Sequence, residues 1–211
     1  MSVRGQAFCK SSYWDLDVTW YAEWPDFTPC FHTTVLVWTP CVLLWLLTPI
    51  EVYLTKASRR QSPVSWTFLG ITKVGLCLLL LGLSFAELAL SLQRHFQEQL
   101  VYSAEFCSTG TKIITFLLVL FLLIKGKRDG KKSSGILLIF WFFLSLCGLF
   151  SYRSILHHVF WEDSFWTPPQ EFILQMLYFP IVFSELILSG FKESTPSDEG
   201  QISEVSEHFT N

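Results

Sequence analysis

Charged residues are scarce in this chain of 211 residues: Asp, Glu, Lys and Arg make up 16% of it, against roughly a quarter in soluble domains. Asparagine is scarcer still, because Asn211 is the only one, so the chain holds no Asn-x-Ser/Thr acceptor for N-glycosylation. Internal repeats of roughly 20 to 50 residues and heptad runs are also missing, which excludes solenoids and coiled coils. Hydrophobic residues make up 51% of the chain, a composition typical of membrane proteins.

Long apolar stretches dominate the chain. A run of about 18 or more such residues is long enough, as a helix, to cross a hydrocarbon core of ~30 Å. We therefore expect an all-α membrane protein with a bundle of five transmembrane helices in residues 32–191. An N-terminal segment, residues 1–31, precedes it, and a flexible acidic linker, residues 192–211, follows it. The predicted spans are residues 33–54, 69–92, 106–124, 133–152 and 172–191.

Lysine and arginine are distributed unevenly between the segments that connect the spans. Segments 55–68, 125–132 and 192–211 together hold nine of them, and the alternate segments hold four. The positive-inside rule assigns the richer side to the cytosol. We therefore expect an extracellular N-terminus, a cytosolic C-terminus and a cytosolic linker, which agrees with an odd number of spans.

The cysteines fall into two groups. Cys9 and Cys30 lie in the predicted extracellular segment, where the secretory pathway favours oxidation, and a disulfide between them would close a loop of 22 residues. The others lie in or at the ends of spans, where cysteine usually behaves as a small apolar side chain. These are Cys41, Cys77, Cys107 and Cys147.

Five charged residues lie within the predicted spans, where a charge at mid-bilayer costs ~2.5 to 3.5 kcal/mol on insertion scales. Glu87 and Lys112 lie at similar depths, ~8 to 9 Å below the outer face, on spans joined by a short connection, so we predict that they pair. Lys73 and Glu185, near the inner face, form a second candidate pair, and Glu51 lies close to the same level. These charges either fix the register of the bundle or line an ion or proton path. No ionisable group lies between the two levels, which favours the structural role.

Two pairs of small residues have the spacing that permits close helix contact. Gly82 and Ala86 lie in the second span, and Thr111 and Thr115 lie in the third. A small-x-x-x-small pattern is frequent in apolar helices, so it supports packing without naming a partner.

Enzyme chemistry is not visible in the sequence. Residues 126–133 are the nearest approach to a phosphate-binding loop, G-x-x-x-x-G-K-S/T, but they have one residue too few between the glycines. Four histidines lie on the predicted outer side, where they could bind zinc, copper or haem, but they lack regular ligand spacing and nearby cysteines. We expect no enzyme, no cofactor or metal in this chain and no nucleic-acid partner. The four are His32, His95, His157 and His158.

Several motifs resemble a known family. Residues 14–20 read W-D-L-D-V-T-W, residues 25–31 read P-D-F-T-P-C-F and residues 34–40 read T-V-L-V-W-T-P. This looks like the start of the multidrug resistance-associated proteins, subfamily C of the ATP-binding cassette transporters. Asp17 stands where many of those proteins carry the Asn of an N-x-T sequon. Further stretches resemble that family's extra N-terminal transmembrane domain: residues 44–49, 86–88, 133–141 and 186–189.

The resemblance implies an accessory membrane domain in front of a transporter core that exports organic anions and glutathione conjugates. ATP and Mg²⁺ would bind that core, outside this chain. The domain would serve trafficking, retention in the plasma membrane and docking to the core or to another membrane protein, within the lipid bilayer. In the related sulfonylurea receptors, the equivalent domain holds a potassium channel. Three alternatives are a stand-alone ion or proton pathway, a regulatory subunit of another membrane protein, and a membrane redox protein that uses the outer histidines.

Overall fold

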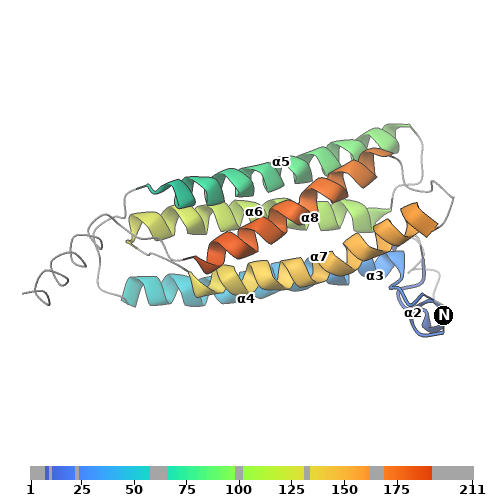
Figure 1. Ribbon diagram of the computed structural model, residues 1–211, viewed down its shortest axis with the longest axis horizontal. Coiled ribbons are helices and arrows are strands. Elements are labelled where there is room, and N and C mark those ends of the chain that lie inside the picture. Colours follow the sequence, from blue (N-terminus) through green and yellow to red (C-terminus); the bar gives the residue numbers. More distant parts are fainter. Residues whose placement is uncertain are drawn as a thin grey trace, which may run out of the picture.

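The computed structural model describes residues 8–9, 11–21, 24–57, 66–97, 102–130, 134–161 and 169–191. Within these residues it contains helices and no strand. Two short helices come first, α2 (Leu16–Thr19) and α3 (Pro29–Thr33). The long helices that follow are α4 (Val35–Ala57), α5 (Phe68–Phe96), α6 (Ser103–Arg128), α7 (Gly135–Trp161) and α8 (Pro169–Gly190) (Figure 1).

Five helical stretches in the described part of the chain are long and apolar enough to cross a membrane. Their surfaces carry exposed large apolar side chains, such as Leu46, which is 67% exposed, and Phe68, which is 86% exposed. In water such surfaces would be costly, whereas in a bilayer they face lipid tails. The expected all-α bundle of five transmembrane helices is confirmed. The stretches are Pro29–Leu54, Phe68–Phe96, Ser103–Arg128, Gly135–His157 and Phe172–Gly190.

Hydroxyl side chains begin several of these helices. Thr28 accepts a hydrogen bond from the N–H of Phe31 at the start of α3, and Thr67 accepts one from the N–H of Gly70 at the start of α5. Ser134 does the same for Leu137 in α7. These bonds satisfy N–H groups that the first helical turn leaves without a partner. At the other end of α6, Gly130 adopts a φ of 79°, a left-handed conformation that glycine adopts without strain.

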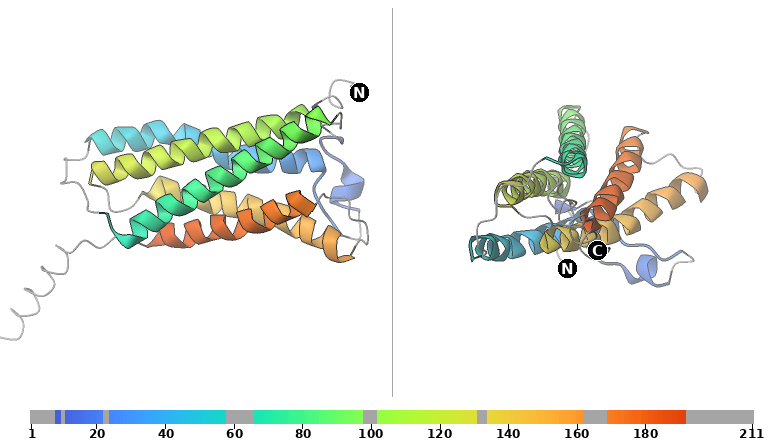
Figure 2. Two further views of the ribbon diagram at one scale, coloured as in Figure 1. Left: turned by 90° about the horizontal axis from the view of Figure 1, so that it is seen from above. Right: turned by 60° about the vertical axis from the view of Figure 1, so that its left-hand side comes forward.

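The long helices form a closed ring in which consecutive helices are not always neighbours. Each helix packs against two others, in the spatial order α4, α6, α5, α8, α7 and back to α4 (Figures 1 and 2). The described residues between 8 and 33, which we call the cover segment, lie at one end of the bundle, which we call the cover end. The opposite end, which we call the basic end, holds the last turn of α6 with Lys125, Lys127 and Arg128.

The middle of the bundle is filled with large side chains. Phe116 of α6 stacks on Trp141 of α7, with ring centroids 6.3 Å apart, and also contacts the ring of Tyr178 in α8. All three are at most 5% exposed, and Leu44 and Leu80 complete the cluster from α4 and α5. Every long helix therefore contributes to one continuous core.

Candidate functional site

A disulfide ties the cover segment to itself. Cys9 and Cys30 are joined, with their Cα atoms 5.4 Å apart, which is the pairing that the sequence predicted. Both cysteines are 4% exposed and pack against Ala104 in the first turn of α6. The bond therefore anchors the beginning of the cover segment beside the start of α3, at the surface of the bundle.

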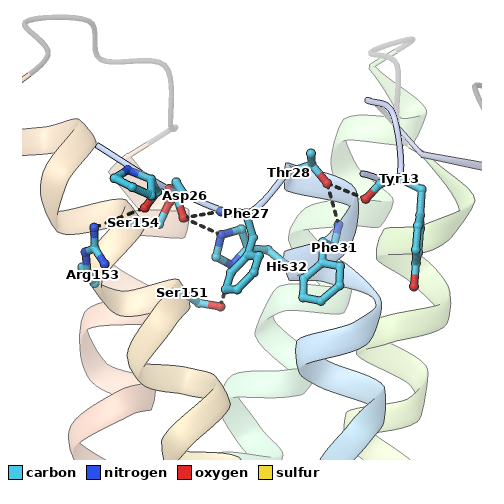
Figure 3. Close-up of polar contacts among 10 residues, drawn as sticks. Tyr13, Asp26, Phe27, Thr28, Phe31, His32, Ser151, Arg153 and Ser154 are labelled. Atoms are coloured by element: carbon cyan, nitrogen blue, oxygen red, sulfur yellow. Dashed lines mark hydrogen bonds and ion pairs between the residues drawn. The ribbon is translucent and has the colours of Figure 1, made fainter. Parts of the chain in front are cut away.

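Asp26 holds the cover segment to α7 (Figure 3). Its carboxylate accepts hydrogen bonds from the hydroxyl of Ser154 and from the N–H of Phe27, and it contacts Nε2 of His32 at 3.1 Å. His32 Nδ1 in turn lies 3.2 Å from the hydroxyl oxygen of Ser151. Residues 128 positions apart in the sequence are thus joined directly. The helix α7 reaches this network because it continues to Trp161, beyond the predicted end of the fourth span at residue 152.

The pKa of Asp26 reports the strength of these contacts. Burial by itself would raise the pKa of this carboxyl group, because it disfavours the charged form. The hydrogen bonds from His32, Ser154 and the Phe27 N–H, together with the attraction of His32, outweigh burial and lower the pKa below its ordinary value of 3.8. The ionised form of Asp26 is therefore the one that the folded protein favours.

Aromatic rings reinforce the same contact. Phe27 stacks on Phe31 with ring centroids 4.8 Å apart, and its edge meets Phe150 of α7 at 5.6 Å. Tyr13 packs against Phe31, and its carbonyl oxygen accepts a hydrogen bond from the Thr28 hydroxyl (Figure 3). The cover segment is therefore held by polar and aromatic contacts together.

Glu87 and Lys112 lie face to face on α5 and α6. Lys112 Nζ donates a hydrogen bond to Glu87 Oε2 at 2.8 Å, so the structure brings together the two charges that the sequence paired by depth. The ammonium group also lies 5.2 Å from the ring centroid of Tyr178. Nearer the cover end, Arg94 forms a second ion pair with Glu105 at 3.4 Å. This second pair was not predicted, because Arg94 and Glu105 lie just outside the spans expected from the sequence.

The predicted pairing of Lys73 with Glu185 is not formed as a direct contact. Lys73 of α5 and Glu185 of α8 are 7% and 1% exposed and attract each other, but they form no hydrogen bond. Neither carboxylate oxygen of Glu185 has a hydrogen-bond partner among the described residues. The equal depth of two residues does not ensure that their side chains meet, because depth leaves the rotation of each helix open. Glu51, also buried near the basic end, accepts a hydrogen bond from Ser134.

The two levels of charge are separated by the central core. Between Lys112 and the basic end lie Phe116, Trp141 and Val182, each at most 1% exposed. Among the described residues, no Asp, Glu, Lys or Arg lies between the two levels, which disfavours the ion-path alternative.

The predicted small-residue contacts are corrected in one helix. Gly82 is exposed, and a Cβ atom there would have no neighbour within 4 Å, so Gly82 makes no close contact inside the bundle, whereas Ala86 is half-buried. Thr115, in contrast, is 1% exposed and accepts a hydrogen bond from the indole N–H of Trp45 at 3.1 Å, joining α6 to α4. Its own hydroxyl donates to the carbonyl oxygen of Thr111.

A close contact that the pattern did not single out joins α7 to α8. A Cβ atom on Gly148 would lie 3.3 Å from Cδ2 of Phe179. Any larger side chain at this position would require the ring of Phe179 to shift.

The histidines do not assemble a metal site in the described residues. No group of three or more His, Cys, Asp or Glu side chains in that part of the chain could hold an ion. His32 contacts Asp26 and Ser151, His95 packs against Phe106, and His157 packs against Trp24. The side chain of His158 lies outside the described residues.

An apolar groove of about 470 Å³ runs between α4 and α6 on the outside of the bundle. Its walls include Trp45, Pro49 and Tyr53, and Tyr53 is 71% exposed. The groove is thus a candidate contact surface within the membrane.

A family model for the ABC transporter TMD0 domain matches residues 7–167. The chain belongs to this family. The matched residues include the Cys9–Cys30 disulfide, Asp26 with its α7 partners, and the Glu87–Lys112 pair, whereas α8 follows the matched range.

Curated relatives agree with this membership. This TMD0 domain is 33% identical over 193 residues to ATP-binding cassette sub-family C member 3 of Mus musculus. It is 32% identical over 196 residues to member 3 of Homo sapiens, and 32% identical over 203 residues to member 2 of Rattus norvegicus. These matches cover 91%, 92% and 96% of the chain, respectively, but only 12%, 13% and 13% of those relatives. The TMD0 domain thus spans about an eighth of the length of the curated relatives it matches.

Proposed function

We propose that this chain is the accessory N-terminal membrane domain of an ATP-driven exporter of organic anions and glutathione conjugates. It serves trafficking, retention in the plasma membrane and docking to the transporter core or another membrane protein, not catalysis. Its N-terminus faces the outside of the cell. ATP and Mg²⁺ act on the core, and this chain contributes helix surfaces.

The observation that carries this proposal is the match of nearly the whole chain to about an eighth of each relative. A segment that matches about an eighth of a transporter and has no Walker motif supports a role that depends on contacts with other protein surfaces. The groove between α4 and α6 offers a surface for it, since the walls include exposed aromatic and aliphatic side chains. We assign this groove to a membrane helix of the transporter core, because association in lipid depends on shape complementarity between such surfaces.

The test is co-purification of this chain with a separately expressed transporter core that lacks these spans, in detergent or nanodiscs. A stable complex that restores delivery of the core to the plasma membrane is the expected result. Replacing Tyr53 by Ala should weaken the complex. The matched control is Leu79→Ala on α5, because Leu79 is 57% exposed but is not a wall of the groove.

Failure of the chain to bind the core, together with ion flux into empty liposomes that contain only this chain, would overturn the proposal. If both substitutions weakened the complex equally, the docking role would stand, but the groove would not be the docking site.

A further inference from the structure

A polar cavity of about 240 Å³ opens among the helices near the cover end. Its walls come from α3, α5, α6, α7 and α8, so it lies inside the ring and not on its lipid-facing surface. Among the described residues, two acidic and two basic side chains line it, together with buried hydroxyl groups such as those of Ser108 and Thr109. The four charged residues are Glu87, Arg94, Glu105 and Lys112.

The charges of this cavity alternate in sign along each helix, and opposite charges face each other between α5 and α6. On α5, Glu87 lies deeper and Arg94 lies nearer the cover end, seven positions along the helix. On α6 the order is reversed, because Lys112 lies deeper and Glu105 lies nearer the end. Seven residues are two helical turns, or about 10.5 Å, so each helix presents two opposite charges on one face.

Lys112 retains hydrogen-bonding capacity beside its ion pair. An ammonium group has three N–H donors, and Lys112 uses one for Glu87. The side chains of Arg94 and Glu105 are 27% and 29% exposed, so both are reached from the cavity. A ligand could therefore bind beside the ion pairs without breaking them.

From this arrangement we propose that the cavity binds a compact zwitterion, with one ammonium group and one phosphate or carboxylate group. The anionic group would lie against Lys112 or Arg94 and the ammonium group against Glu105 or Glu87. The charges of the described lining residues sum to zero, so a neutral zwitterion leaves no uncompensated charge among them, whereas an anion or a cation alone would leave one.

Two sources could supply this chemistry. In a phospholipid of the leaflet at the cover end, the phosphate lies deeper than the ammonium group. This polarity matches α6, where Lys112 is the deeper residue and Glu105 the shallower one. A free solute of the amino-acid kind could enter from the water phase in either orientation.

The soluble arm of the test titrates the full chain with glycerophosphoethanolamine in maltoside micelles, by isothermal titration calorimetry. Glycerol phosphate, which is only an anion, and ethanolamine, which is only a cation, are the comparison ligands. The lipid arm places the chain in phosphatidylglycerol nanodiscs that contain a minority of phosphatidylethanolamine and measures the retained lipid by native mass spectrometry. Binding in either arm supports the proposal and identifies the source.

The decisive variant is Arg94→Gln/Glu105→Gln, which removes one charge of each sign from the cavity. The matched control is Arg128→Gln/Asp129→Asn, which removes the same charges from exposed positions near the basic end. We expect the cavity variant to raise the Kd for the zwitterion by at least about 10-fold. We expect the control to leave the Kd unchanged, with both variants retaining the helical circular dichroism spectrum.

The proposal is overturned if neither arm detects binding. It is also overturned if glycerol phosphate or ethanolamine alone binds as tightly as the zwitterion, or if the cavity variant binds like the unmodified chain.

Discussion

Lys112 Nζ lies 2.8 Å from Glu87 Oε2, so an acid on α5 and a base on α6 compensate each other inside a predominantly apolar bundle. The side chain of Lys112 is 14% exposed and that of Glu87 is 19% exposed. Because each is largely removed from water, the loss of either partner leaves a charge without compensation.

Replacing Lys112 by Met should therefore lower the free energy of unfolding by roughly 1 to 3 kcal/mol, as expected when a charged hydrogen-bonding partner is removed. The addition of Glu87→Gln should restore most of that loss, since the remaining side chain is then uncharged. Chemical unfolding in mixed micelles measures both variants. A double variant no more stable than Lys112→Met would argue against the pair.

Replacing Cys9 and Cys30 by Ser should destabilise the cover segment by roughly 3 kcal/mol, because the disulfide restricts a loop of about 22 residues in the unfolded chain. Limited proteolysis should then cut within that segment before it cuts the bundle. Maleimide labelling before and after reduction checks the bond itself. An unreduced protein in which both thiols react would contradict the structure.

The attachment of the cover segment to α7 should depend on acid pH. The native pKa of Asp26 lies below its ordinary value of 3.8, so the folded state binds the proton less readily than the unfolded state does. The stability contributed by Asp26 is therefore complete above about pH 4 to 5 and is lost as the pH falls through the native pKa.

In the Asp26→Asn variant, the loss of stability between about pH 5 and pH 2 should be shallower, as followed by protease protection of the cover segment. Asp17→Asn is the matched control, because Asp17 is exposed and its side chain has no part in the α7 network. Identical pH profiles for all three proteins would contradict the role of Asp26.

The predicted orientation can be tested with the same Asp17→Asn substitution in cells. It creates the sequon Asn-Val-Thr at positions 17–19, whereas Glu204→Asn creates Asn-Val-Ser at positions 204–206. With an extracellular N-terminus, only the first variant should gain a glycan, seen as a gel shift that a glycosidase reverses. A glycan on the second variant alone would place the chain the other way round.

Gly148→Leu should destabilise the packing of α7 on α8 by roughly 1 to 3 kcal/mol, because a larger side chain meets Phe179 in a packed contact. Gly82→Leu offers the matched control on α5, where a Cβ atom has no neighbour within 4 Å. Melting temperatures in detergent measure both. If Gly82→Leu were the more damaging substitution, the assignment of Gly82 to an exposed face and of Gly148 to a packed face would be wrong.

The sequence predicted the number of spans and the depth of residues in the membrane. Span number and the level of Glu87 and Lys112 follow from hydropathy and from counting residues, because each helical residue rises by a fixed distance. The disulfide between Cys9 and Cys30 was also predictable, since only these two cysteines lie in the segment predicted to be extracellular, residues 1–31.

Rotation about each helix axis was not predictable from the sequence. A helix such as α7, which is apolar on all sides, has no polar stripe that would distinguish the face that packs from the face that meets lipid. The pattern therefore selected Gly82, which is exposed, and passed over Gly148, which packs against Phe179. For the same reason it paired Lys73 with Glu185 by level alone. The contact of Asp26 with Ser154 joins segments 128 positions apart, and no local pattern encodes it.

The spatial order of the helix ring has a consequence for biogenesis. The helices that are neighbours in both sequence and space form two hairpins, α5–α6 and α7–α8, while α4 packs on one member of each. Each hairpin can enter the membrane as a unit during synthesis, but α4, made before both, reaches its final neighbours only after α7 has been inserted. Two fragments divided between α6 and α7 should therefore reassemble when co-expressed, with α4 as the element that joins them.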